Sequence, residues 1–213
     1  MDQPTLTITA GARMPTRHGE FMMESFRLGD EHRDRPDADA GRPAPHLALS
    51  VGLGTRELPL VRIHSECITG ETFGSVRCDC GQQLDESLRR IHDAGCGVLV
   101  YLRQEGRGIG IENKLRAYAL QDQGLDTVDA NLALGLPVDA RSYRPAARYL
   151  QHHAIRRCVL LTNNPDKARD LRAHGIEVDR APLQSAAHPA CHGYLETKRL
   201  RLGQDLEMPC TQG

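Results

Sequence analysis

Residues 62–83 read RIHSECITGETFGSVRCDCGQQ, a polar stretch that places Cys67, Cys78 and Cys80 in the pattern Cys-x10-Cys-x-Cys. The N-terminus shows no basic start followed by an apolar block, so no secretory signal is visible and we expect a cytoplasmic protein. In a reducing compartment, clustered cysteines bind metal more often than they form disulfides. Three thiolates leave the fourth position of a zinc ion open to water or substrate, as in catalytic zinc sites.

The residues around the cysteines help to distinguish a catalytic zinc site from a structural one. Spacing alone also allows a structural zinc knuckle with His64 or His92 as the fourth ligand. Charged and polar side chains crowd the cysteines, namely Arg62, His64, Ser65, Glu66, Asp79, Gln82 and Gln83. A structural knuckle does not need this density of polar groups, whereas a site that orients a polar substrate does. The neighbours therefore favour a catalytic site.

Apolar patterns on both sides of this stretch predict the surrounding elements. Apolar runs predict strands at residues 19–23, 46–52, 58–64, 97–102 and 158–162. Helical spacing and capping signals predict helices at residues 84–94, 114–123, 143–153 and 165–174, with a short one near 195–202. We therefore expect an α/β (mixed α+β) fold, with a strand-rich N-terminal half and alternating strands and helices in the second half.

Composition limits the class of protein. The chain has 213 residues, enough for a real hydrophobic core. We expect one compact domain over residues 1–203, including a polar, proline-rich loop at 29–46, and a flexible tail at 204–213. A net charge of -1, 4% aromatic residues and no Trp give no sign of a nucleic-acid surface. No apolar stretch approaches the ~18 residues of a membrane helix. We therefore expect neither a nucleic acid nor a membrane as partner.

A second polar stretch, RQEGRGIGIENK at residues 103–114, follows a predicted strand and enters a predicted helix. Its glycines do not form a dinucleotide fingerprint, because the third required glycine falls on Ile111. Glu105 and Arg107 stand at a helix N-terminus, where backbone amides and an arginine suit phosphate. An ordinary surface loop is the alternative interpretation.

Two further stretches carry polar groups at turns. LLTNNPDKARDL, residues 160–171, presents a strand end, a helix N-terminus and Lys167, although it lacks the glycines of a P-loop. GLPVDARSY, residues 135–143, places Asp139 and Arg141 on one face of an extended turn. Taken alone, the first is a good helix cap and the second a surface ion pair. Beside residues 103–114, the first suggests a polyphosphate held from two sides.

Four of these segments, taken together, resemble the GTP cyclohydrolase II family. They are HSECITGETFGSVRCDCG, RQEGRGIGIENKLRAYALQDQGLDTVDAN, LGLPVDARSY and LLTNNPDKA, which occur in the family's order between residues 15 and 203. The resemblance implies hydrolysis of GTP at the guanine imidazole ring, with release of formate and pyrophosphate, as the first step of riboflavin biosynthesis. It also implies one Zn²⁺ per subunit, Mg²⁺ with the triphosphate, a homodimer and the single-function form of the enzyme.

The resemblance assigns roles residue by residue. Cys67, Cys78 and Cys80 match the zinc ligands. Asp139 matches the family's proton acceptor, Arg141 its proposed nucleophile, and Tyr118 a tyrosine linked to ring opening. The residues that would contact GTP are Arg62, Ile63, His64, Ser65, Glu66, Gln83, Glu105, Gly106, Arg107, Thr127, Thr162 and Lys167.

Several alternatives remain open from sequence. Because the pKa of arginine lies above ~12, Arg141 could stabilise charge on the α-phosphate while water attacks. A paralogue could keep the formyl group or serve a specialised pathway, and Tyr118 argues against the first of these. A non-catalytic protein that binds zinc and GTP is a third alternative. The chain also departs from the family pattern at Ser142, where Asp is frequent, and at Gln204, where His is common.

Overall fold

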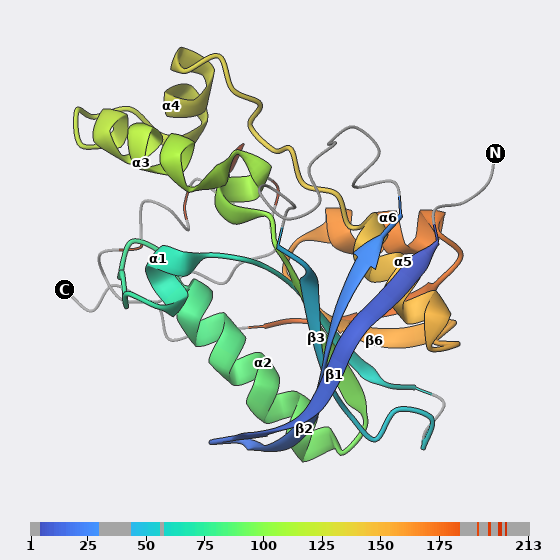
Figure 1. Ribbon diagram of the computed structural model, residues 1–213. Helices are drawn as coiled ribbons and strands as arrows, with labels where there is room; N and C mark the ends of the chain where they lie inside the picture. The colour runs from blue at the N-terminus through green and yellow to red at the C-terminus, as the bar shows by residue number, and fades with distance from the viewer. Residues whose placement is uncertain are drawn as a thin grey trace.

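Seven strands form one sheet in the order β1-β2-β3-β5-β4-β6-β7 in the computed structural model (Figure 1), which describes residues 5–29, 44–55, 58–183, 191, 196, 200, 201 and 203. The strands are β1 (Leu6–Thr16), β2 (Gly19–Leu28), β3 (His46–Val51), β4 (Leu60–Ser65), β5 (Gly97–Leu102), β6 (Arg157–Leu161) and β7 (Glu177–Ala181). Strands β1, β2, β3 and β5 pair antiparallel, whereas β5, β4, β6 and β7 pair parallel. The sheet is therefore antiparallel on one side and of the α/β type on the other.

Helices connect the parallel strands and cover the sheet. They are α1 (Ile68–Glu71), α2 (Cys80–Ala94), the 3-10 turn η1 (Glu105–Gly108), α3 (Gly110–Gln121), α4 (Thr127–Ala133), α5 (Arg144–His152) and α6 (Pro165–Ala173). Asn164 caps α6 by accepting a hydrogen bond from the Asp166 amide at 2.9 Å, and Pro165 occupies the first turn. Figure 1 shows α3 and α4 projecting beyond the end of the sheet.

The two faces of the sheet bury separate apolar clusters. Alternate residues of β5 point to opposite faces, so Val98 and Val100 pack with α5 and α6, whereas Leu99 packs with α2. Tyr149 of α5 and Ile91 of α2 are fully buried on their respective faces. Because both faces of β5 are covered, its sequence GVLVYL reads as a continuous apolar run rather than an alternating one.

The parallel pairing of β4, β5 and β6 determines where the polar segments meet. The carboxyl ends of these strands lie at the same edge of the sheet, where His64 pairs with Tyr101 and Ser65 with Leu102. The cysteine stretch follows β4, residues 103–114 follow β5, and residues 162–167 follow β6. In open α/β sheets, ligands bind at this edge.

The structure confirms the α/β fold and the predicted elements that fall in the described residues up to 183, with shifts of up to about five residues at their ends. Residues 97–102 form β5 as predicted, and the helix expected at 114–123 begins earlier, at Gly110. The predictions missed β1, α1, α4 and β7. Of the expected loop, residues 30–43 lie outside the described residues, as do the tail 204–213 and most of the expected helix near 195–202. Among the described residues, no helix has the length and apolar character needed to cross a membrane.

Candidate active site

Three cysteine sulfurs meet at the carboxyl edge of the sheet. Cys67 precedes α1, Cys80 begins α2, and Cys78 lies in the turn between the two helices. Their Sγ atoms all lie within 4.8 Å of one another, and those of Cys67 and Cys78 are 3.5 Å apart. Contact with the Cys67 sulfur raises the pKa of Cys78, because two neighbouring thiolates repel each other, so the three thiols resist ionising together without a cation.

The sulfurs fit a zinc ion with an open position. Three converging thiols are the donor type that zinc prefers, and the described residues add no fourth His, Cys, Asp or Glu to the group. The Nε2 atom of His64 lies 2.7 Å from Glu71 Oε1, and His92 packs against the ring of Phe21. The knuckle interpretation, which needs one of these histidines as the fourth ligand, therefore finds no support among the described residues.

A buried carboxylate fixes the segment that carries Cys67. Glu71 of α1 accepts hydrogen bonds from the Cys67 amide at 3.0 Å, from His64 Nε2 at 2.7 Å and from the Tyr101 hydroxyl at 2.5 Å. Burial lowers the pKa of His64, so its ring is neutral at pH 7 and Nε2 carries the proton that Glu71 accepts. Glu71 thus ties α1 to β4 and β5 beneath the cysteines.

The turn after β5 brings a second buried carboxylate to the cysteines. Glu105 accepts hydrogen bonds from the amides of Ile68 at 2.6 Å and Gly106 at 2.7 Å, and it pairs with Lys114 at 2.7 Å. Gly106 and Arg107 both have left-handed backbones, with φ of 62° and 59°. That conformation is unfavourable for arginine, and strain of this kind is typical of functional sites.

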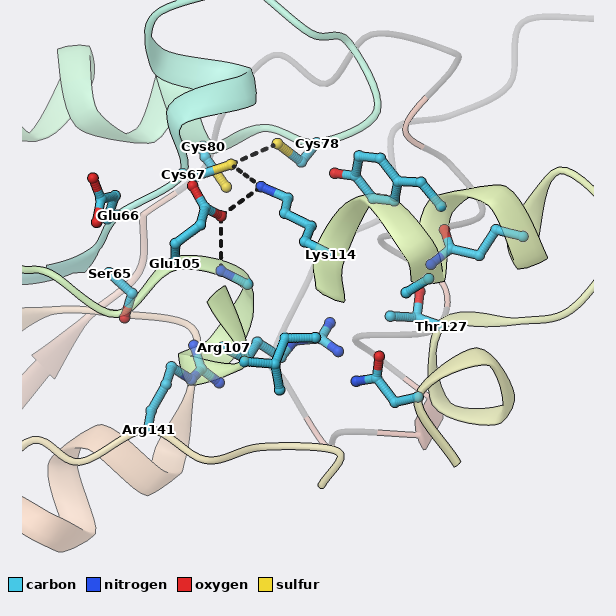
Figure 2. Close-up of a pocket in the computed structure, with 16 residues that line it drawn as sticks. Ser65, Glu66, Cys67, Cys78, Cys80, Glu105, Arg107, Lys114, Thr127 and Arg141 are labelled. Carbon is cyan, nitrogen blue, oxygen red and sulfur yellow. Dashed lines mark hydrogen bonds and ion pairs between the residues drawn. The ribbon is translucent and has the colours of Figure 1, made fainter. Parts of the chain in front are cut away.

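A hollow of about 630 Å³, part of it open to solvent, lies beside the sulfurs (Figure 2). Its wall consists of Ser65, Glu66, Cys67, Cys78, Cys80, Glu105, Gly106, Arg107, Ile109, Lys114, Ala117, Tyr118, Gln121, Thr127, Asn131 and Arg141. Burial raises the pKa of Tyr118 to about 12, so its hydroxyl stays protonated at neutral pH. Burial also raises the pKa of Glu66. We call this space the thiol hollow.

A second hollow of about 550 Å³ adjoins the first and is rich in cationic groups. Its wall consists of Arg62, His64, Ser65, Cys80, Gln83, Arg107, Arg141, Thr162, Asn163, Asn164 and Lys167. Arg62 donates hydrogen bonds to the Leu161 carbonyl at 2.9 Å and to Gln83 Oε1 at 2.7 Å, and burial lowers its pKa to about 10. Lys167 donates to the Ile63 carbonyl at 2.9 Å. We call this space the cationic hollow.

The two hollows share part of their walls. Ser65, Cys80, Arg107 and Arg141 line both. The turn that carries Arg141 is tied to the η1 turn, because the Ala140 amide donates to the Arg107 carbonyl at 3.0 Å. Figure 2 shows the sulfurs and the Lys114 amine grouped together, with Arg107 and Arg141 at another part of the wall. One ligand can therefore reach from the sulfurs past both arginines into the cationic hollow.

Asp139 and Arg141 form a close ion pair. The Arg141 Nε donates to Asp139 Oδ1 at 2.9 Å, its NH2 group donates to Oδ2, and its own backbone amide donates to Oδ1 at 3.0 Å. Burial opposes ionisation of Asp139, but the hydrogen bonds from Arg141 outweigh it and hold the pKa of the carboxyl below its usual range. The carboxylate therefore orients the guanidinium while remaining ionised at neutral pH.

The structure brings most of the predicted site residues to the two hollows. The predicted GTP contacts Ser65, Glu66, Glu105, Gly106, Arg107 and Thr127 line the thiol hollow, as does Tyr118, and Arg62, His64, Gln83, Thr162 and Lys167 line the cationic one. Two positions differ. Asp139 lines a separate surface hollow next to Arg141. The Ile63 side chain is buried in the core, because its strand position faces α5 and α6, and only its carbonyl serves the site, by holding Lys167.

Sequence reasoning missed several polar residues of this region. Glu71 and Lys114 lie within the motifs but were assigned no role, and Tyr101 lies next to the last residue of β5, an apolar strand that reads as core. Asn131 is buried in the wall of the thiol hollow on α4, a helix that was not predicted. Buried lysines and carboxylates are rare, and no local pattern relates Lys114 on α3 to the cysteines, so the sequence carried no signal for its role.

Comparison with known proteins yields one family. Residues 7–182 match the family model described as GTP cyclohydrolase II. The chain is 48% identical over 196 residues to a GTP cyclohydrolase-2 of Acinetobacter baumannii (strain SDF), covering 91% of this chain and 92% of that protein. It is 47% identical over 200 residues to a GTP cyclohydrolase-2 of Neisseria meningitidis (strain FAM18), covering 93% and 95%.

A further relative is longer. The riboflavin biosynthesis protein RibBA of Salinispora tropica is 49% identical over 199 residues, which cover 92% of this chain and 47% of that protein. The chain thus spans about half the length of this relative and nearly the whole length of the two cyclohydrolases. Since the family model covers most of the chain and the matched segments include the thiol cluster and both hollows, the chain belongs to the GTP cyclohydrolase II family.

Proposed function

We propose that this protein hydrolyses GTP, opens the guanine imidazole ring and releases formate and pyrophosphate, as the first step of riboflavin biosynthesis. The observation that carries the proposal is the shared wall of the two hollows, which joins a three-thiol group to a cationic space through Arg107 and Arg141. A purine nucleoside triphosphate has the matching form, with a base at one end and a polyanion at the other. The family to which the chain belongs supports the same reaction.

The zinc ion would be held by Cys67, Cys78 and Cys80. When bound, it would act as a Lewis acid that activates water at neutral pH. The Tyr118 hydroxyl lines the same hollow and stays protonated, so it can donate a proton or a hydrogen bond to the guanine ring. Thr127 and Asn131 add polar groups to the wall, which suits a base with donors and acceptors at its edges.

The cationic hollow would bind the triphosphate. Arg62 and Lys167 are buried there with their charged groups held by backbone carbonyls, and Thr162 lies at the end of β6 beside them. The Arg62 Nε is buried and has no hydrogen-bond partner among the described residues, so we expect Arg62 to act on the triphosphate through its positive charge. No carboxylate lines the described wall, so Mg²⁺ would take its ligands mainly from phosphate oxygens and water.

Arg141 would act at the α-phosphate, between the two hollows. Its guanidinium is paired with the ionised Asp139 carboxylate, which favours a charged arginine that stabilises negative charge while water attacks. We expect Arg141→Ala to slow pyrophosphate release by about 10²–10³-fold, the loss seen for other transition-state donors. Incubation with GTP labelled in the α-phosphate, followed by denaturation, tests the covalent alternative, because a labelled protein adduct that Arg141→Ala abolishes would establish Arg141 as the nucleophile.

The cellular setting forms part of the proposal. A cytoplasmic location suits the protein, because the described cysteines are free thiols and the metal site needs them reduced. A homodimer is proposed from the family resemblance alone, and sedimentation equilibrium of the purified protein is the direct test.

Product analysis tests the proposed reaction. The zinc-loaded protein is incubated with GTP and Mg²⁺, and formate, pyrophosphate and the nucleotide product are quantified by mass. Formate and pyrophosphate in equal amounts are expected. Pyrophosphate without formate would instead show that the ring stays closed or keeps its formyl group, and no turnover at all would favour a binding protein.

A further inference from the structure

Lys114 reaches from α3 into the cysteine cluster, although the sequence gives it no role there. Its side chain is only 11% exposed. The Nζ atom lies 3.1 Å from Cys67 Sγ and 2.7 Å from Glu105 Oε1 (Figure 2). It also lies 2.9 Å from Thr69 Oγ1. An ammonium group has three N–H donors and no lone pair, so these three acceptors use all of its donors. Lys114 therefore contacts a metal-binding sulfur without being able to bind the metal itself.

The surroundings hold this amine in place. Glu105 is anchored by the amides of Ile68 and Gly106, and Thr69 lies in α1, two residues after Cys67. The same amine lies 5.8 Å from the centre of the Tyr118 ring. Lys114 thus contacts the Cys67 sulfur and lies over the ring of Tyr118, which lines the thiol hollow.

We propose that Lys114 is a positioning residue of the metal centre, which donates a hydrogen bond to the Cys67 thiolate. A donor at sulfur draws electron density from it, so the thiolate gives less charge to the metal and the metal remains a stronger Lewis acid. The cation also offsets part of the charge that three thiolates bring together. This inference rests on the proposed function, because it requires that the cysteines hold a metal.

A purely structural role for Lys114 is the competing explanation. Glu105 is a buried carboxylate, and the lysine would then serve only to neutralise it. Lys114→Met removes the donor but leaves Glu105 buried without its ion pair. The double variant Lys114→Met with Glu105→Gln removes both charges and so leaves no unpaired buried carboxylate. A defect that remains in it is therefore due to the lost contact with Cys67.

Zinc affinity of the purified full-length protein is the first measurement, by competition with a chromophoric chelator. We expect Lys114→Met to weaken zinc binding by about 10–100-fold, the usual cost of losing a partner of a metal ligand. The double variant should remain similarly weak. Arg116→Met is the matched control, since it removes a cation from the exposed face of the same helix, and its affinity should equal that of the wild type.

Cobalt substitution supplies a readout that a structural role would not change. Without the Lys114 donor, the Cys67 sulfur is more electron-rich, so the sulfur-to-cobalt charge-transfer band should move to longer wavelength in both Lys114 variants. An unchanged band, or zinc affinity restored in the double variant, would overturn the proposal. If the wild type itself binds no stoichiometric zinc, the proposed metal centre fails first, which distinguishes the two failures.

Discussion

Glu71 is a single carboxylate on which three parts of the site depend. It accepts hydrogen bonds from the Cys67 amide, His64 and Tyr101, which belong to the cysteine segment, β4 and β5. Burial and the neighbouring Glu71 charge raise the pKa of Tyr101, so its hydroxyl remains a donor. One buried carboxylate thereby links three segments through hydrogen bonds and holds the cysteine segment against β4 and β5.

We expect Glu71→Gln to lower the free energy of unfolding by about 2–3 kcal/mol, because an amide replaces a charged acceptor and turns its own N–H groups toward buried donors. Urea unfolding of the metal-free protein measures the change. Glu112→Gln is the control, since that side chain is 83% exposed on α3 and should change stability little. Equal losses in the two variants would contradict the role assigned to Glu71.

At the scale of elements, α1 and α2 approach so closely that no side chain fits between them. A Cβ atom at Gly81 would lie 2.6 Å from the Gly70 carbonyl oxygen, and one at Gly70 would lie 2.9 Å from Cys78 Sγ. Backbone, rather than a flexible side chain, stands opposite Gly81, so the contact cannot relax without moving a helix. This approach places Cys80 within reach of Cys67.

Gly81→Ala therefore sets two effects against each other. Helix propensity alone would make alanine more stable than glycine by about 1 kcal/mol. The clash with Gly70 should outweigh this gain, separate α1 from α2 and weaken zinc binding by about tenfold or more. Chelator competition and thermal unfolding would measure both changes. Gln82→Ala on the exposed face of α2 should leave both unchanged, and a more stable Gly81→Ala with full zinc affinity would refute the argument.

At the scale of the whole molecule, the free energy of unfolding should depend on pH through His153, which lies outside the candidate active site. The His153 ring follows α5, lies 4.5 Å from the Tyr149 ring and contacts Glu24 of β2 at 3.2 Å. Burial lowers its pKa below the ordinary value of 6.5, despite the raising effect of Glu24. Below pH ~6.5 the unfolded chain binds a proton that the folded chain resists, so stability falls as pH falls.

We expect His153→Gln to flatten the decline in unfolding free energy as the pH falls below about 6.5, by at most ~1.4 kcal/mol per pH unit. The slope should vanish below the lowered pKa, where both states are protonated. Denaturant unfolding at a series of pH values measures this slope for both proteins. Subtracting one slope from the other leaves the part that is due to His153. His152→Gln is the control, because His152 is exposed. The pH dependence of its unfolding free energy should stay closer to that of the wild type than the pH dependence of His153→Gln does.

Metal removal should also act on the whole molecule, because the metal would join two helix starts and a turn. At free zinc a thousandfold above the dissociation constant, binding stabilises the folded state by about 4 kcal/mol. We expect a chelator to lower the unfolding temperature of the wild type. Cys96→Ala, outside the cluster, should retain this shift, whereas Cys78→Ala should lose most of it. A shift that persists in Cys78→Ala would place the metal elsewhere.

Particular elements show how far the sequence could be interpreted. The apolar run at 97–102 predicted β5, and Asn164-Pro165 predicted the start of α6, since both signals depend on adjacent residues. Strand β1 was missed although apolar residues occupy alternate positions from Leu6 to Met14, because two of them are alanines and most of its side chains are exposed, which makes the alternation a weak signal. Strand β7 buries little beyond Val178, and α4 is too short for a clear helical period.

The sequence by itself determined the chemistry available, namely three thiols, a cationic set and the segments that carry them, because residue type and local periodicity depend on near neighbours. The tertiary structure alone decided that β4, β5 and β6 run parallel and bring those segments to one edge. It also decided that Lys114 meets Cys67, that Glu71 meets Tyr101, and that Ile63 faces the core. Such contacts follow from the packing of apolar faces that lie far apart in the chain, and no local pattern encodes that packing.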